Sequence, residues 1–338
     1  MVMATTTQPI LIIGAGISGL TLAQACRKEN IPYRIFERDL SATHRSAGWG
    51  LTLNWGLPAF RSLLPDDILD RLPETYVNKE AVDAGEKGSF SYYDLSTGEA
   101  RWHTPASERI RVSRERLRRL MSDGLDVEFG KVLVDVRESE DGVTVLFDDD
   151  SSADGMLLVG CDGANSVARR LCHPYDYENH ELPIRFLGTG VHYDFEQVRE
   201  IRRLDPYFLQ GSDPRSDVFL WFSFLNTPSD PDSGEGRDGK YYCQIMTSWP
   251  ARSGFLGKGE VSEIPDGKQK QLEWMKHLAS DWVEPFRSIV QDIPEDCEVL
   301  PIHLADWQPR RTNGGRIVLV GDAAHVSLWL LLSAPPSC

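Results

Sequence analysis

Short apolar runs, each followed at once by glycine or aspartate, recur along the chain. The first run is Ile10–Ile13, and three glycines come soon after it. Apolar residues at helical spacing follow, from Leu20 to Cys26, and a second strand-like run at residues 33–36 leads into Glu37. An apolar run of this length, bounded by turn residues, is typical of a strand buried on both faces in a parallel sheet. The opening segment therefore predicts a strand, a helix and a second strand.

Two later segments repeat the strand-and-turn half of this pattern. They are MLLVGCDGANSVARR at residues 156–170, with Asp162, Gly163, Ser166 and Arg169 at D-G-x-x-S-x-x-R spacing, and GRIVLVGDAAH at residues 315–325, with a strand over 317–320 followed by Gly321 and Asp322. Taken alone, each could be an ordinary strand that ends in a tight turn, because Asp and Gly are common turn residues.

Alternating apolar and polar positions mark two further regions. Residues 126–150 predict a β-ribbon across a turn at residues 140–142, in which Val132, Val134 and Val136 pair with Val143, Val145 and Phe147. Strand-like runs rich in aromatic and β-branched residues follow at residues 184–195, 217–225 and 240–249. Apolar spacing near the end of this region predicts one helix over residues 269–290.

Composition narrows the class of protein. The chain has 338 residues, enough for two domains, and its 41% hydrophobic and 26% charged residues are ordinary for a globular protein. Its formal charge of −15 argues against nucleic acid as a partner. The six cysteines form no C-x-x-C pair, the N-terminal segment has no apolar signal region, and no apolar run is long enough for a transmembrane segment, so we expect a cytoplasmic protein.

The glycine turn after the first strand indicates a dinucleotide site. Gly14, Gly16 and Gly19 stand in G-x-G-x-x-G order: the first makes the turn, the second lets a pyrophosphate approach the backbone, and the third lets helix and strand pack closely. The helix N-terminus then faces the phosphates. Glu37 lies where a carboxylate can accept hydrogen bonds from ribose hydroxyls and would repel a 2′-phosphate. FAD and NAD both fit this motif.

In their order along the chain, the three motifs resemble those of the flavoprotein monooxygenases of the para-hydroxybenzoate hydroxylase type, which include many fungal aromatic hydroxylases. The resemblance extends from about residue 9 to residue 325. It implies an α/β fold, with a Rossmann-like FAD-binding domain interleaved with an α+β substrate domain built on a mixed β-sheet. We expect the FAD-binding domain to comprise residues 1–75, 105–180 and 306–338, and the substrate domain to comprise residues 76–104 and 181–305.

The resemblance also implies roles for individual residues. The implied cofactor-binding residues are Gly14, Gly16, Gly19, Glu37, Arg38, Gly48, Gly50, Arg114, Asp162, Gly163, Gly321 and Asp322. Among them, Arg114 would contact phosphate or ribityl oxygens, and Asp322 would hydrogen-bond the ribityl chain. Arg116, Arg118 and Arg119 are expected to form a solvated helix face instead.

A loop at residues 45–54 would pass close to the flavin ring, where Gly48 and Gly50 permit backbone approach and Arg45 is a candidate contact. Trp49 could shield the ring or serve as an ordinary core residue. Candidate pocket residues, each of which could equally belong to the core, are His192, Tyr193, Tyr207, Trp221 and Tyr241.

The reaction that the resemblance implies is monooxygenation. NADPH or NADH would reduce FAD, O2 would form a flavin C4a-hydroperoxide, and one oxygen atom would pass to a small aromatic or polyketide-like substrate. No Ser-His-Asp arrangement and no metal-ligand spacing stands out, which suits an enzyme whose cofactor carries the difficult chemistry. Two alternatives are a flavin-dependent dehydrogenase or reductase on the same fold and a truncated, non-catalytic nucleotide-binding protein.

The segment after His325 departs from the family pattern. In the family a proline, a glycine-rich turn and a long helix follow the third motif, whereas here the chain reads VSLWLLLSAPPSC. We therefore expect a family member that is truncated within this motif, with weakened FAD affinity and stability, because the N-terminus of the missing helix would stabilise negative charge on the reduced flavin.

Overall fold

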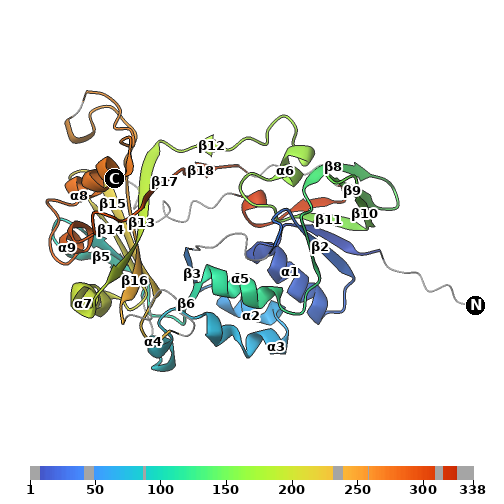
Figure 1. Cartoon of the computed structure of the whole chain (residues 1–338), viewed down its shortest axis with the longest axis horizontal. Helices are drawn as coiled ribbons and strands as arrows, with labels where there is room; N and C mark the ends of the chain where they lie inside the picture. Colours follow the sequence, from blue (N-terminus) through green and yellow to red (C-terminus); the bar gives the residue numbers. More distant parts are fainter. Residues whose placement is uncertain are drawn as a thin grey trace, which may run out of the picture.

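The computed structural model describes residues 8–41, 49–86, 89–230, 239–257, 259–308 and 315–325. Two bodies lie side by side, each built on one large β-sheet, and short strands and connections fill the space between them (Figure 1). The fold class is α/β, as the sequence predicts.

One body is built on a parallel sheet of five strands in the order β19-β11-β1-β2-β7. The strands are β1 (Ile10–Ile13), β2 (Tyr33–Glu37), β7 (Val127–Phe129), β11 (Leu157–Gly160) and β19 (Ile317–Leu319). Alternate side chains of β1 enter different cores: Ile12 packs with helices α1 (Ile17–Lys28) and α5 (Arg114–Ser122), whereas Leu11 and Ile13 pack against a small antiparallel sheet. Burial on both faces explains the unbroken apolar runs.

That small sheet corrects the predicted ribbon. It consists of β8 (Leu133–Glu138), β9 (Val143–Phe147) and β10 (Ser152–Gly155), while β7 pairs with β2 in the parallel sheet. Val136 lies opposite Val145, so one member of each predicted set does pair with the other. Val134, however, falls at an irregularity in the register and is exposed, and Leu133 takes the buried position opposite Phe147. A bulge shifts the inward-facing set by one residue, which alternation alone does not reveal.

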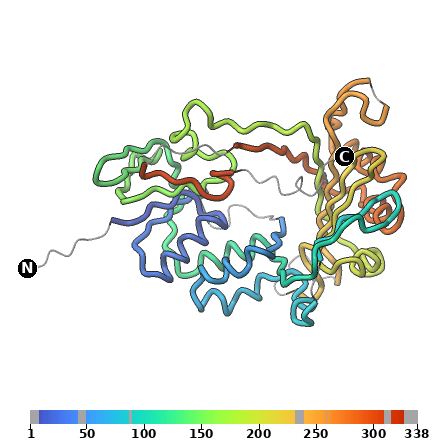
Figure 2. The backbone as a smooth tube through the Cα atoms, turned by 180° about the vertical axis from the view of Figure 1, so that it is seen from behind, coloured from blue at the N-terminus to red at the C-terminus, as the bar shows by residue number. Residues whose placement is uncertain are grey.

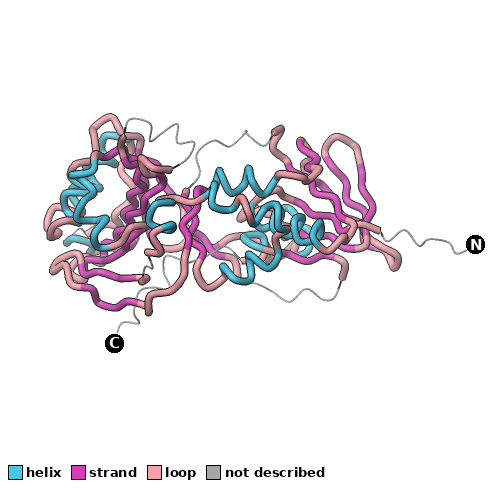
Figure 3. The backbone as a smooth tube through the Cα atoms, turned by 90° about the horizontal axis from the view of Figure 1, so that it is seen from below, coloured by secondary structure: helices cyan, strands magenta, loops and turns pink. Residues whose placement is uncertain are grey.

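The second body is built on a mixed sheet of seven strands in the order β17-β13-β16-β15-β14-β4-β5. The strands are β4 (Ser91–Asp94), β5 (Ala100–His103), β13 (Ile184–Tyr193), β14 (Phe208–Asp213), β15 (Val218–Asn226), β16 (Tyr241–Pro250) and β17 (Val299–Ile302). Helices α7 (Phe195–Leu204), α8 (Lys268–Leu278) and α9 (Phe286–Gln291) pack on the face that lies away from the first body (Figure 3).

The single helix predicted over residues 269–290 is wrong, because α8 ends at Leu278 and α9 begins at Phe286. Pro285 stands directly before α9, and a proline cannot donate the backbone hydrogen bond that a continuous helix would need there. Apolar residues continue at helical spacing because both helices pack on the same core.

Two short two-stranded sheets join the bodies. β3 (Gly50–Leu53) pairs with β6 (Ile110–Ser113) between the large sheets, and β12 (His180–Glu181) pairs with β18 (Ala305–Asp306) along one edge (Figures 1 and 2). The remaining elements are α2 (Leu57–Leu63), α3 (Asp66–Leu69), η1 (Leu72–Thr75), α4 (Lys79–Asp83), α6 (Val167–Cys172), η2 (Phe255–Gly257) and η3 (Gly321–Ala323). The chain thus passes repeatedly between the two bodies, and the predicted domain boundaries remain a prediction.

Candidate active site

The glycine turn between β1 and α1 is shaped by close packing at two of its glycines and by open space at the third. Gly14 has φ of 101°, and a Cβ there would lie 2.5 Å from the Cys161 carbonyl oxygen. A Cβ on Gly19 would overlap the Gly14 carbonyl, so α1 could not pack this closely on β1. A Cβ on Gly16 would meet no atom of the described residues within 4 Å. The turn thus leaves an open approach to the backbone at the N-terminus of α1.

Glu37, at the end of β2, is held against this turn. One carboxylate oxygen accepts a hydrogen bond from the Ala15 amide at 2.7 Å, and the other accepts from the Asp39 amide at 3.0 Å. The side chain is buried, with 6% of its residue surface exposed. Arg38 is exposed beside it. The carboxylate is therefore fixed in orientation by the backbone of the glycine turn.

Arg118 lies beside Glu37 and the glycine turn. The prediction that it belongs to a solvated helix face is wrong. Its Nε donates to the Ala15 carbonyl at 3.0 Å, and its guanidinium lies 3.9 Å from the carboxylates of both Glu37 and Asp39. Arg118 stands one helical turn beyond Arg114, so both lie on the same side of α5, whereas Arg119 is exposed. Helical spacing from Arg114 could have singled it out.

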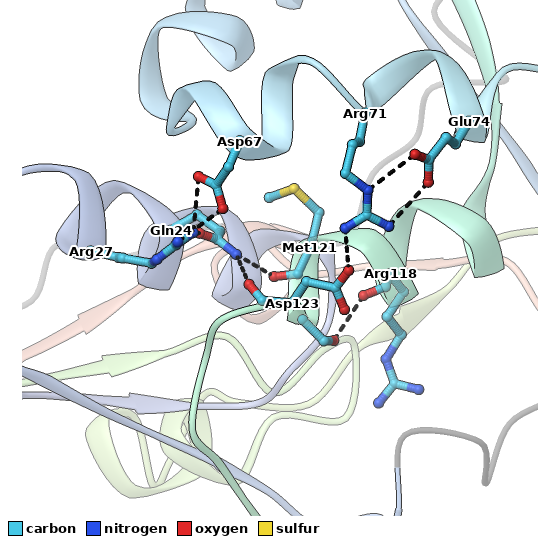
Figure 4. A network of polar contacts seen from close by, with 9 residues as sticks. Gln24, Arg27, Asp67, Arg71, Glu74, Arg118, Met121 and Asp123 are labelled. Carbon is cyan, nitrogen blue, oxygen red and sulfur yellow. Dashed lines mark hydrogen bonds and ion pairs between the residues drawn. The ribbon is translucent and has the colours of Figure 1, made fainter.

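Helix α5 is fastened to α1 behind this corner. The amide nitrogen of Gln24, a fully buried α1 residue, donates to the carbonyls of Met121 and Asp123, each at 2.9 Å (Figure 4). These bonds satisfy carbonyls at the C-terminal end of α5, which lack partners within the helix. Surrounding ion pairs are Arg27–Asp67, Arg71–Glu74 and Arg71–Asp123. The position of Arg118 over the glycine turn depends on this anchoring.

The second motif owes its spacing to the start of α6. Asp162 accepts hydrogen bonds from the Ser166 hydroxyl and, at 2.7 Å, from the Val167 amide. The Ser166 hydroxyl in turn accepts from the Arg169 amide at 2.8 Å, as an N-cap does. Gly163 has φ of 85°, and a Cβ there would lie more than 4 Å from every atom in the part of the chain that the structure describes. Both oxygens of Asp162 therefore hold the helix, while the backbone at Gly163 is open to a ligand.

Buried Arg169 joins the second motif to the third. Its guanidinium donates to the Asn179 side chain at 2.8 Å and to the carbonyls of Asp322 and Ala323, each at 3.4 Å. It also lies 5.0 Å above the ring of Trp307. Burial lowers the pKa of this guanidinium, and the charge of Asp162 opposes that shift. Arg169 thus acts as a cross-brace between the ends of β11 and β19.

The third motif meets the first. Gly321 has φ of 65°, and a Cβ there would overlap the hydroxyl of Ser18 in the first turn of α1. The Asp322 side chain is exposed and makes no hydrogen bond or ion pair to the part of the chain that the structure describes. Three turns, at residues 14–19, 161–164 and 321–323, are therefore packed together at the carboxyl ends of β1, β11 and β19, where open α/β sheets bind ligands.

Gly50 lies against the side chain of a buried arginine. A Cβ on Gly50 would overlap the guanidinium of Arg111, a β6 residue that is 1% exposed. Arg111 donates to the Phe224 carbonyl at 2.8 Å, the Thr52 hydroxyl at 3.0 Å and the Ser223 hydroxyl at 2.6 Å. Gly50 thus makes room for this guanidinium, and nothing in the structure tests an approach to flavin. Gly48 and Arg45 lie outside the described residues.

Arg111 and Trp49 identify the face of the seven-stranded sheet that looks toward the first body. Arg111 reaches Ser223 on β15, and the Trp49 ring lies beside Gly188 on β13. By alternation, that face also carries the predicted pocket residues His192 and Trp221. It carries in addition three residues that the sequence reasoning missed, which are Tyr242, Gln244 and Met246.

The other three predicted pocket residues belong to the protein core. The Tyr193 hydroxyl donates to the Ile289 carbonyl at 2.6 Å beneath the helices, and Tyr241 packs against the same cluster. Tyr207 is fully buried between Ala81 and Phe208. Tyr241 and Tyr242 are neighbours in sequence and face opposite sides of β16. Tyr241 therefore packs in the core, whereas Tyr242 lies on the face of the candidate site.

Comparison with known proteins decides the family. Residues 7–328 match the FAD binding domain family model. The chain is 47% identical over 336 residues to an Arthroderma benhamiae protein named "Probable FAD-dependent monooxygenase", covering 95% of this chain and 77% of that protein. It is 38% identical to an FAD-dependent monooxygenase of Emericella nidulans, covering 96% of this chain and 82% of that protein. The chain belongs to the FAD-dependent monooxygenases.

Solved structures agree in fold. Klebsiella pneumoniae HpxO complexed with FAD and uric acid aligns with a TM-score of 0.68 at 21% identity, covering 94% of this chain and 73% of that one. Arthrobacter nicotinovorans 2,6-dihydroxypyridine-3-hydroxylase aligns with a TM-score of 0.67 at 19% identity, covering 95% and 78%. The expected Rossmann-like fold is confirmed.

The residues that form the three turns fit the cofactor of this family. Open space at Gly16 and Gly163 would admit a diphosphate to the backbone, and the N-terminus of α1 offers it a partial positive charge. The exposed carboxylate of Asp322 is available as an acceptor for hydroxyl groups.

Within the described residues, none of the helices has the length and apolar character needed to cross a bilayer.

Proposed function

We propose that the protein inserts one oxygen atom of O2 into a small aromatic or polyketide-like substrate, with NADPH or NADH as the reductant. The observation that carries the proposal is the arrangement of the two sheets. The turns that fit FAD lie at the strand ends of one sheet, and the second sheet turns toward them a face bearing Trp221, Tyr242 and Met246. Membership of the FAD-dependent monooxygenases supplies the reaction class.

The family resemblance assigns residues to FAD, and the geometry of the turns supports these assignments. Gly16 and the N-terminus of α1 would receive the diphosphate, Glu37 the adenosine ribose, and Asp322 the ribityl chain, with Arg114 and Arg118 as cations at the edge of the site. When bound, the flavin supplies hydride acceptance and O2 activation, chemistry that protein side chains lack.

The protein's own contribution is orientation and the exclusion of water. Apolar and aromatic side chains on the second sheet would cover the reacting ring, and a dry site protects reactive oxygen species from wasteful hydrolysis. Arg111 bonds both Thr52 on β3 and Phe224 on β15, so it holds β3 at a fixed distance from the second sheet.

The test is incorporation of labelled oxygen. Purified protein would be incubated with FAD, and its visible absorbance would be recorded to detect bound flavin. NADPH and NADH would then each be supplied with 18O2 and a phenolic test compound. Product that gains one 18O atom supports the proposal. Reduction or dehydrogenation without 18O would instead indicate a flavin dehydrogenase or reductase, and protein that never retains flavin would indicate a non-catalytic nucleotide-binding chain.

The proposal also includes the domain boundaries and the cellular location. We place the FAD-binding domain at residues 1–75, 105–180 and 306–338 and the substrate domain at residues 76–104 and 181–305, because the members of each large sheet come from these ranges. We also propose a cytosolic location, in keeping with the free thiols of all five described cysteines. Limited proteolysis and fractionation of the native host would test these two statements.

A further inference from the structure

A chain of hydrogen bonds leads from β6 across β15 to β16, on the sheet face that looks toward the cofactor turns. Arg111 Nη2 donates to Ser223 Oγ at 2.6 Å, Ser223 Oγ lies 3.1 Å from Gln244 Oε1, and Gln244 Nε2 lies 3.4 Å from Met246 Sδ. The four residues have exposed fractions of 1%, 0%, 2% and 7%, respectively. Water therefore does not compete for these polar groups.

The direction of this chain is fixed by its first member. A guanidinium has only donors, so the Ser223 hydroxyl must accept from Arg111. The single proton of Ser223 then has the side-chain oxygen of Gln244 as its acceptor among the described residues. With this assignment the amide of Gln244 turns its oxygen toward Ser223 and its NH2 group toward Met246.

The NH2 group of Gln244 has a poor partner. Its acceptor among the described residues is the thioether sulfur of Met246, which accepts hydrogen bonds only weakly. A buried amide without a good acceptor is costly, so a ligand oxygen at this position would be favoured. The methionine side chain is unbranched and flexible, which makes it the group that can move aside to admit such a ligand.

The surroundings of Gln244 favour a neutral ligand. Its cross-strand neighbour on β13 is Gly190, and the residues that flank it on β16 are Tyr242 and Met246, a phenol and a thioether. His192 lies on the same face, with its ring stacked on that of Tyr242 at a centroid distance of 4.7 Å. Each nitrogen of the Arg111 guanidinium already donates to a protein oxygen. A carboxylate would thus find no uncommitted cation among these described neighbours.

We propose that Gln244 is a specificity-determining residue whose amide donates to a carbonyl or phenolic oxygen of an uncharged aromatic substrate, with Ser223 and Arg111 as positioning residues that fix the orientation of the amide. The inference rests on the proposed function, because it assigns the ligand of that same site.

The experiment compares two probes that differ by one carbonyl oxygen, 1-tetralone and tetralin. Binding of each to FAD-loaded protein would be measured by equilibrium dialysis. We expect the wild type to prefer the ketone and Gln244→Leu to lose about tenfold in ketone affinity, with tetralin affinity unchanged. Gln244→Glu, which keeps the shape and exchanges the NH2 donor for an acceptor, should lose more. Ser223→Ala should lose less, because the amide is still present but free to turn.

The matched control is Gln271→Leu, which removes another buried glutamine amide that donates to the Pro265 carbonyl, far along the chain on α8. It should leave the ratio of the two affinities unchanged even if it lowers stability. Wild type that binds both probes equally, or binds neither, overturns the inference, as does a Gln244→Leu variant with an unaltered ratio. The proposed function is judged separately, by 18O incorporation in the wild type.

Discussion

The two large sheets contribute to the candidate active site with different parts of their strands. The five-stranded sheet contributes the turns that follow its strand ends, at Gly14, Asp162 and Gly321. The seven-stranded sheet contributes one face, through side chains such as Ser223 and Gln244 that come from the middle of their strands. A site at strand ends is specified by a few consecutive residues, whereas a site on a sheet face is specified by register between distant segments.

This difference predicts that the turns tolerate almost no added atoms where they pack. Gly19→Ala would force a Cβ into the Gly14 carbonyl, so we expect a loss of about 2–3 kcal/mol in the free energy of unfolding and loss of FAD binding by more than about 100-fold. Urea unfolding and FAD fluorescence titration measure the two effects. Gly16→Ala is the matched control, because a Cβ there meets open space; it should keep its stability and lose FAD affinity alone. Equal stability losses in both variants would contradict the distinction.

Gly50 could make room for the Arg111 guanidinium or could contact the cofactor. A double-mutant cycle can separate these two roles. If Gly50 exists to admit the guanidinium of Arg111, Gly50→Ala should cost about 1–3 kcal/mol in the wild type and about 1–2 kcal/mol less in an Arg111→Met background. Chemical unfolding of the four proteins gives the coupling. If the loss of FAD affinity on adding the methyl group is instead the same in both backgrounds, Gly50 serves the cofactor directly.

Arg118 tests whether the corner beside Glu37 contributes to cofactor affinity. Removal of its charge in Arg118→Met should weaken FAD binding by about tenfold, since a charge-assisted contact beside an anionic cofactor is lost. Arg119→Met, on the exposed side of the same helix, should change FAD affinity little. The measurement is quenching of FAD fluorescence at fixed ionic strength, and identical affinities of the two variants would exclude the assigned role.

The smallest expected effect concerns the thiols beneath the turns. Burial raises the pKa of Cys161 to about 12 and that of Cys172 to about 11, from an ordinary value of 9.0. The folded state therefore holds protons that the unfolded chain releases above pH 9, so stability should fall as pH rises from 9 toward 12. Unfolding midpoints at pH 8 and pH 10 would show it, and Cys161→Ala should reduce the dependence. Stability that is flat across this range would contradict the assignment.

The sequence predicted the strand ends well because their chemistry is local. Gly14, Gly19 and Gly321 occupy positions that only a residue without Cβ can fill, and the helix cap at Asp162 is made within six residues of the chain. The strand β1 was predicted to the residue. These features need no knowledge of distant segments.

The sheet face was predicted poorly because its determinants are distant in sequence. Tyr241 and Tyr242 are equally aromatic, and only the pairing of β16 with β13 and β15 assigns Tyr242 to the side of the site. No local signal singles out Arg111, because its partner Ser223 lies more than a hundred residues away. At a bulge that no local signal marks, Leu133 takes the buried position that was predicted for Val134.

The pairing of β19 with β11 has a consequence for how the chain matures during synthesis. β11 ends at Gly160, but its neighbour on the outer side, β19, begins at Ile317. While the ribosome makes strands β13 to β17 of the seven-stranded sheet, β11 has an unpaired edge, and unpaired edges promote aggregation. Nascent chains should therefore depend on chaperones until β19 emerges and pairs with β11, which also brings the Asp322 turn to the other two.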